Sequence, residues 1–482
     1  MDKPAVFTAE EITRFRAELA ARRSPGAYEP GRWSVSPLTR RPDVRGPMPG
    51  SVRLRDATLR SVETLPGVVA STGAKEAYLR RLAGAGVREV VTAGLTGRDD
   101  KALRAEVEVI KGENPDCRAV LPLLRTTEDI DRAADAGYDA VQIWVQGLGE
   151  ASLLYNPAVY QQAWRGEDWR GPATPRGRAD VLARALPLIR HARSRGLDAV
   201  VPMLMVSFLT DDILDESVTA LTAAGATELT LFDGPGAMSP EAYAHLVTRT
   251  RELAPGVEVG LHPHNTFGLA VACAVAAVRA GADVVELSVN GYCGGPGNAD
   301  LAATALAFEA LYGVHTGIRT ERLTELARAG EELTGYHLAW NHPVTGTSAF
   351  SWGGMDLITQ ETAVDPLLHN CLEPALVGNA RKVPFTPDSG PYTLADKLTA
   401  LGVDTTVAQV DEILRRARDL MAREARLLTD TDLAALAREV TGAPEPAALS
   451  DSAEPTEVTE ATEVQEVSKV SEVAEPPART ER

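Results

Sequence analysis

Residues 258–291 read EVGLHPHNTFGLAVACAVAAVRAGADVVELSVNG, and this stretch decides the fold. A short β-branched run is followed by a helix-like segment rich in Ala, and then by a second β-branched run. The glycine of RAGADV at 279–284 is typical of a helix end just ahead of a strand. The stretch therefore predicts one strand–helix–strand unit.

The same unit recurs outward along the chain. Eight alternating strand–helix units predict an α/β fold, a (β/α)8 TIM barrel over residues 51–318. An open, doubly wound sheet is the alternative, but eight evenly spaced units close more naturally than they stay open. The eight strand-like runs are SVRLRDATL (51–59), REVVTAG (88–94), RAVLPLLR (118–125), AVQIWVQG (140–147), AVVPMLMVS (199–207), ELTLFDG (228–234), EVGLHPHN (258–265) and DVVELSVNG (283–291).

Three segments of different composition flank the predicted barrel. Residues 1–50 predict an N-terminal amphipathic helix followed by an extended arm rich in Pro, Gly and Arg. Residues 319–440 predict a mostly helical subdomain with a Gly/Pro-rich irregular middle. Residues 441–482 hold ten acidic and three basic residues and no aromatic residue. Because such a segment cannot bury enough apolar surface to offset its ordering entropy, we predict a disordered acidic tail.

Composition excludes several classes of function. The formal net charge of -18 argues against non-specific binding to nucleic acid or to an anionic membrane. The four cysteines are scattered and form no CxxC pair, so neither a disulfide framework nor a structural zinc site is predicted. No signal peptide and no run of about 18 apolar residues is found, which predicts a cytoplasmic protein.

Polar residues that can bind a metal occur where two strands of the barrel end. The first strand ends in Arg55 and Asp56, with Arg60 close behind, and the seventh ends in His262 and His264. Active sites of this fold lie at these carboxyl ends. A His-x-His pair places two imidazoles on one face of a strand, and the strand of Asp56 is the second neighbour in a closed barrel. Such a site suits Mg, Mn, Zn, Co or Fe(II) without choosing among them.

A chance His-x-His in a strand and a surface Arg–Asp salt bridge are the competing interpretation. The chain has only eight histidines, and two of them fall at the same end of the barrel as Asp56. This co-occurrence favours one divalent ion held by Asp56, His262 and His264.

Four segments of the sequence resemble those of a known enzyme family. The sequences LRDATLRSVETLPGV (54–68) and HPHNTFGLAVACAVAAVRAGADVVELSVNGYCGGPGNADL (262–301) resemble the two barrel motifs of the homocitrate, isopropylmalate and citramalate synthases. These share their DRE-TIM, HMGL-like barrel with the hydroxymethylglutaryl-CoA lyases. NHPVTGTSAF (341–350) and LEPALVGNARKV (372–383) resemble the connecting subdomain of homocitrate synthases.

The resemblance covers about 51–440 and implies an enzyme with small-molecule substrates. It implies an acyltransferase that condenses an acyl-CoA with a 2-oxo acid, or a carbon–carbon lyase. It further implies a homodimer in which the subdomain packs over the barrel mouth of the partner. Neither nucleic acid nor membrane is an expected partner.

The resemblance also assigns roles to single residues. It matches Asp56, His262, His264 and Asn298 to the metal ligands or their immediate neighbours. Arg55 matches the arginine that binds the oxo-acid oxygen, where a cation and a metal together stabilise negative charge. Arg125 matches an arginine suited to gripping a substrate carboxylate. The further candidates are Glu63, Cys293 and His342 for catalysis, and Thr92 and Trp352 for substrate contacts.

Departures from the family pattern concern groups that move protons. The family usually reads Asp-Gly-Glu-Gln where this chain has Ser61-Val-Glu-Thr, and its strand-2 glutamate falls on Val91, with Glu89 two residues earlier on the same face. The subdomain histidine that follows Ala-Phe is lost in the sequence Ser351-Trp352. These changes predict an unusual substrate of specialised metabolism. His342 or Cys293 would take over the proton transfer of the lost groups. The alternatives are a lyase step of the HMG-CoA lyase type and a non-catalytic barrel retained as a partner protein.

Overall fold

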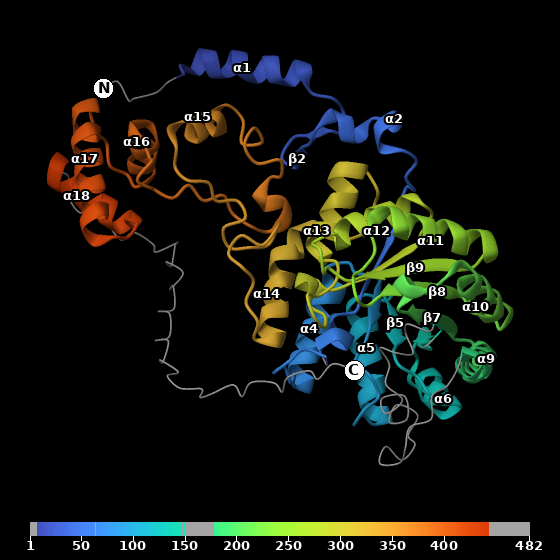
Figure 1. Ribbon diagram of the computed structural model, residues 1–482. Coiled ribbons are helices and arrows are strands. Elements are labelled where there is room, and N and C mark those ends of the chain that lie inside the picture. The colour runs from blue at the N-terminus through green and yellow to red at the C-terminus, as the bar shows by residue number, and fades with distance from the viewer. Residues whose placement is uncertain (1–6, 63, 147, 150–177, 443–482) are drawn as a thin grey trace, which may run out of the picture. The chain divides into compact units, whose positions relative to one another are not determined.

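A computed structural model describes residues 7–62, 64–146, 148–149 and 178–442, and its larger unit contains a closed parallel barrel (Figure 1). Its strands are β3 (Arg53–Asp56), β4 (Glu89–Val91), β5 (Arg118–Leu121), β6 (Ala140–Gln142), β7 (Asp198–Leu204), β8 (Glu228–Asp233), β9 (Glu258–Pro263) and β10 (Val284–Leu287). Each strand pairs with the next along the chain, and β10 returns to pair with β3. Each predicted β-branched run forms one strand. The TIM-barrel prediction is confirmed, and the open sheet is excluded.

Helices between the strands cover the outside of the barrel (Figure 1). Local capping sets their ends: α6 (Thr127–Ala136) begins with a capping box between Thr126 and Asp129 and ends at the left-handed Gly137. Their apolar faces join the outward faces of the strands in one continuous core. The other helices of this layer are α3 (Thr58–Val62), α4 (Thr72–Gly84), α5 (Asp100–Glu113), α9 (Arg178–Ser194), α10 (Asp211–Ala223), α11 (Pro240–Leu253), α12 (Ala270–Arg279) and α13 (Leu301–Leu306).

The interior of the barrel holds a small apolar cluster and a charged network. The apolar cluster consists of Ala57, Val91, Val120, Ala140 and Val200. The charged network is centred on Arg55, which is fully buried and pairs with Glu89, Glu228 and Glu286. Because side chains alternate along a strand, Arg55 faces the interior while Asp56 faces the helix layer.

The N-terminal segment packs on the polypeptide that follows the barrel. It begins with α1 (Ala9–Arg22), which opens with a Thr8–Glu11 capping box. Arg16 donates to the carbonyls of Ala363 and Val364, at the end of α15 (Asp356–Val364). The segment continues through β1 (Tyr28–Glu29), β2 (Trp33–Ser34), the 3-10 helix η1 (Pro37–Arg40) and α2 (Pro42–Arg45).

The chain divides into two compact units after Pro384. The barrel unit includes α14 (Leu323–Thr334), which packs on α4, and the segment up to 384. The second unit has its own apolar core, formed by α16 (Pro391–Ala400), α17 (Val407–Glu424) and α18 (Asp430–Thr441). The predicted 319–440 subdomain is thus shared between the two units, and almost all of the predicted tail lies outside the described residues. Among the helices that the structure describes, none is long and apolar enough to cross a membrane.

Candidate metal centre

Two histidines and one cysteine meet at the carboxyl end of the barrel. His262 lies in β9 and His264 directly follows the strand. The Cys293 Sγ lies 3.9 Å from Nε2 of His262 and 3.7 Å from Nε2 of His264. One ligand atom from each of the three residues lies within 4.8 Å of the other two, so a single metal ion can contact all of them. His262 and Cys293 are buried, and His264 is partly exposed.

A tight loop after β10 brings Cys293 to the imidazoles. The backbone N–H of Asn298 donates to the carbonyl of Gly291 over 3.1 Å and closes the loop. A Cβ at Gly297 would collide with that carbonyl, and Gly297 has a φ of 83°, so glycine is required there. Asn298 also forms a β-bridge with His264, which joins the loop to the end of β9.

Glu286 of β10 orients the first imidazole. Its Oε1 lies 2.9 Å from Nδ1 of His262, and the ring of Phe232 stacks on a face of the imidazole with the ring centroids 3.9 Å apart. Burial raises the pKa of Glu286, but the bond to His262 and the positive charges of His262, Arg55 and Arg60 together lower it to about 2. A carboxylate that accepts the Nδ1 proton leaves the Nε2 lone pair free to bind a metal.

Arg60 supplies positive charge next to the cysteine. Its guanidinium is buried, with NH2 4.0 Å from the Cys293 Sγ, and it lies over the ring of Trp144 at 5.1 Å and near that of Phe232 at 5.7 Å. Burial raises the pKa of the Cys293 thiol, but Arg60 and the two imidazoles lower it well below its usual value. The thiolate is therefore the favoured form, as metal binding requires.

Asn298, whose backbone is bridged to His264, carries a buried oxygen donor. Its amide nitrogen donates to the Ser288 hydroxyl over 3.0 Å, but its Oδ1 is buried without a hydrogen-bond partner. A buried polar atom without a partner is costly unless an ion or water completes it. Two imidazoles, one thiolate and one amide oxygen fit a divalent metal ion.

Comparison with known proteins identifies the family of this chain. The HMGL-like family model matches residues 174–329. A putative (R)-citramalate synthase from Methanopyrus kandleri is 34% identical over 82% of this chain and 74% of its own length, and a probable 2-isopropylmalate synthase of that organism is 32% identical over the same shares. This chain belongs to the family of citramalate, isopropylmalate and homocitrate synthases.

A homocitrate synthase and one solved structure are also similar to this chain. A homocitrate synthase from Methanopyrus kandleri is 29% identical over 84% of this chain and 96% of its own length. The HMG-CoA lyase of Bacillus subtilis has 19% identity and a TM-score of 0.50 over 61% of this chain and 96% of that chain, which shows the shared fold. The predicted family and the prediction of an acyltransferase or carbon–carbon lyase are confirmed.

Asp56 does not join the three-residue group. Its carboxylate accepts bonds from the backbone N–H of Thr58 at 3.1 Å and from the Thr58 hydroxyl at 2.7 Å, and Tyr78 of α4 donates from 3.3 Å. The reason is strand alternation, which turns Asp56 toward the helix layer while His262 faces the barrel interior. Burial raises the pKa of Asp56 to about 6. The predicted convergence of Asp56 with the imidazoles is therefore corrected.

Arg55 is also placed differently from the sequence-based expectation. Its NH1 donates to Glu228 over 2.9 Å and to Glu286 over 3.3 Å, and the side chain is fully buried. Glu286 links it to His262, so Arg55 supports the site from within the barrel. A direct contact between Arg55 and a substrate oxygen stays a prediction, and Arg60 is the cation beside Cys293.

Three other residues were suggested by the sequence for the site, and neither of the two that the structure describes is part of the group of His262, His264 and Cys293. Thr92 is buried, with its hydroxyl 3.3 Å from that of Tyr138, in the layer between strands and helices. Arg125 is exposed just after β5. Glu63 lies outside the described residues. Their predicted roles stay predictions.

Two candidates come from the segment after the barrel. His342 Nε2 lies 3.7 Å from Oδ2 of Asp300, two residues beyond Asn298 in the sequence. Trp352 donates its indole N–H to Asn370 over 2.6 Å and stacks edge-on against His369. His342 thus lies close to the loop that carries the site but forms no hydrogen bond with Asp300, and the roles of His342 and Trp352 stay predictions.

Sequence reasoning missed the roles of Arg60, Glu286 and Phe232. Arg60 carried a signal, since it directly precedes the Ser61-Val-Glu-Thr block that departs from the family pattern. Glu286 carried a weaker signal, as the one acid inside the apolar stretch VVEL (284–287). Nothing local marks Phe232, because its stacking on His262 depends on the pairing of β8 with β9.

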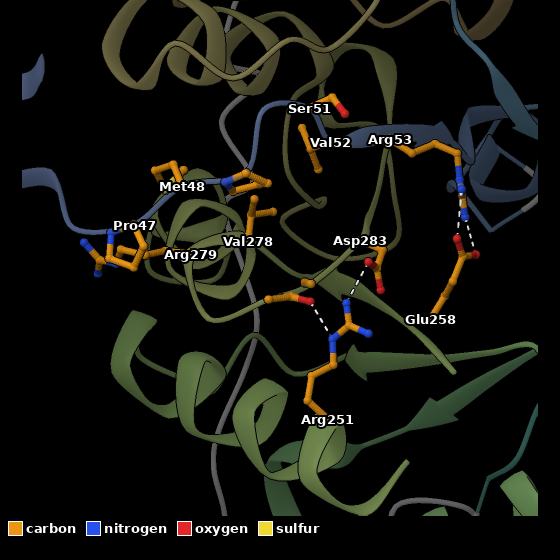
Figure 2. Close-up of a pocket in the computed structure, with 13 residues that line it drawn as sticks. Pro47, Met48, Ser51, Val52, Arg53, Arg251, Glu258, Val278, Arg279 and Asp283 are labelled. Carbon is orange, nitrogen blue, oxygen red and sulfur yellow. Dashed lines mark hydrogen bonds and ion pairs between the residues drawn. The ribbon is translucent and has the colours of Figure 1, made fainter. Parts of the chain in front are cut away.

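A cavity of about 530 Å³ lies at the opposite end of the barrel (Figure 2). Arg53 and Glu258, which open β3 and β9, line it and bond to each other, and Arg251 bonds to Asp283 across it. Because these residues precede their strands or begin them, the cavity is at the amino end. This cavity therefore lies at the end of the barrel opposite to the group of His262, His264 and Cys293.

Proposed function

We propose that this protein is a divalent-metal-dependent enzyme that forms or cleaves a carbon–carbon bond at a 2-oxo acid, with acyl-CoA as the partner substrate. The group formed by His262, His264 and Cys293 at the carboxyl end of the barrel carries the proposal. The names of the relatives, which are synthases of citramalate, isopropylmalate and homocitrate, support condensation. An unusual 2-oxo acid remains part of the proposal, because the proton-transfer positions differ.

The residues around the group have separate tasks in this reaction. A bound divalent ion would polarise the oxo group and stabilise the charge that develops on its oxygen. Arg60 offers a buried guanidinium to the carboxylate or enolate oxygen of the acid. Glu286 holds His262 in one orientation, and the rings of Trp144 and Phe232 keep water from the guanidinium.

Metal content and activity test this proposal together. Reconstituted protein is expected to hold about one divalent ion per chain and to release free thiol from acetyl-CoA with at least one acid in a panel that runs from pyruvate to aromatic 2-oxo acids. His262→Ala should lose both properties because one of the imidazoles is removed.

His245→Ala is the matched control, since His245 is exposed on α11, in the helix layer outside the barrel. It should keep both the ion and the activity. Elemental analysis that finds no metal after reconstitution would refute the mechanism, and so would full activity in His262→Ala.

We further propose a homodimer, which the resemblance to the synthases implies. Light scattering at micromolar concentration is expected to give a mass of twice the 51.3 kDa of one chain. Dilution to nanomolar concentration serves as the control for a specific dimer, since non-specific association falls away first. A monomer at micromolar concentration would contradict the proposal.

A further inference from the structure

The metal centre indicates which class of ion it holds, an inference that rests on the proposed function. We propose that Cys293 is a direct thiolate ligand of the metal, and that the resulting centre selects a thiophilic ion of the Zn²⁺ class over Mg²⁺ or Mn²⁺. This assigns Cys293 to ligation and gives the barrel a sulfur-containing site.

The distances support a shared ion. Zn–S bonds of about 2.3 Å and Zn–N bonds of about 2.0 Å, at a tetrahedral angle, place sulfur and nitrogen about 3.5 Å apart. The Cys293 Sγ lies 3.7 Å and 3.9 Å from the two Nε2 atoms. Small side-chain movements therefore suffice for all three atoms to bind one ion.

Among the described residues, Cys293 is the group's one candidate for an anionic ligand. Among the residues that the structure describes, no carboxylate joins the group of His262, His264 and Cys293. Asp56 faces the helix layer, and Glu286 holds the far nitrogen of His262. The first strand instead leads to Ser61, whose hydroxyl lies 3.5 Å from the Cys293 Sγ.

The loop after β10 also carries an oxygen donor without a partner. The Oδ1 of Asn298 is buried without a partner, and Asn298 is bridged to His264 through the backbone. A set of two nitrogens, one sulfur and one amide oxygen suits Zn²⁺, Co²⁺ or Fe²⁺. Mg²⁺ and Mn²⁺ prefer carboxylate, carbonyl and water oxygens instead.

The absorption spectrum of the cobalt-substituted protein detects a sulfur ligand directly. Metal-free full-length protein is loaded with Co²⁺, and we expect a thiolate-to-cobalt charge-transfer band in the near ultraviolet. Cys293→Ser should lose this band and should bind Zn²⁺ at least about 100-fold more weakly, more than the loss of an outer-shell partner costs. Competition should show Zn²⁺ displacing Mg²⁺ and Mn²⁺ from the unmodified protein.

Cys273→Ser is the matched control, because Cys273 is also buried but contacts the carbonyl of Met238 on the outside of the barrel. It should keep the band and the Zn²⁺ affinity. The spectrum of the unmodified protein tests the proposal even if a variant does not fold. Absence of the band there, an unchanged band in Cys293→Ser, or tighter binding of Mg²⁺ than of Zn²⁺ would each overturn it.

The spectra need no substrate, so they separate this inference from the proposed function. A cobalt–sulfur band without turnover on any 2-oxo acid would support the ligand and refute the proposed reaction. Metal-dependent turnover without the band would support the reaction and refute the ligand.

Discussion

Replacing Arg55 by Met is expected to lower the free energy of unfolding by about 3–5 kcal/mol. Arg55 is fully buried and is in ion-pair contact with three carboxylates that are themselves buried, Glu89, Glu228 and Glu286. Removing the cation leaves uncompensated charge inside the barrel, because water cannot reach it. A protein of ordinary stability loses a large fraction of its margin in this way.

Urea denaturation of the full chain measures this effect. Arg249→Met is the matched control, since Arg249 pairs with Asp215 on the helical surface, where both side chains are about a third exposed. That change should cost less than about 1 kcal/mol. If Arg55→Met is equally mild, the interior carboxylates carry no net charge that needs Arg55, and the stabilising role expected for this cation is wrong.

The second large effect concerns substrate choice. The metal-loaded protein is expected to condense acetyl-CoA with 2-oxoglutarate or 2-oxoisovalerate at a rate lowered by about two to four orders of magnitude, the usual cost of losing a positioned general base. Val91 stands at the position of the family's strand-2 carboxylate and lies in an apolar interior cluster. Glu89, two residues earlier, is bound to Arg53 and Arg55 and is fully buried.

Release of free thiol from acetyl-CoA measures this rate with each acid in turn. Metal content is determined on the same sample, so that an inactive preparation is not mistaken for substrate selectivity. Turnover near about one per second, which is ordinary for an enzyme on its own substrate, would show that another group replaces the base. The protein would then act as a standard synthase. His342, close to Asp300, would be the first residue to replace in that case.

Local pattern in the sequence determined the barrel and half of its site. Alternation of β-branched runs with Ala-rich segments, punctuated by glycine, is a property of neighbouring residues, and it predicted all eight strands. The period of two along β9 likewise placed His262 and His264 together. The segments that resemble the synthase motifs were long enough to identify the family, and this required no knowledge of contacts between distant residues.

Which polar residues meet the imidazoles was decided only by the tertiary structure. Arg55 and Asp56 are adjacent in the sequence, and their residue types do not say which of them faces the barrel interior. Closure of the barrel brings carboxylates from β4, β8 and β10 around Arg55, while strand alternation turns Asp56 toward Tyr78. The closed loop at Gly291 carries Cys293 to the imidazoles. These contacts join residues that are distant in the sequence, and they form only when the strands pair and the loop closes.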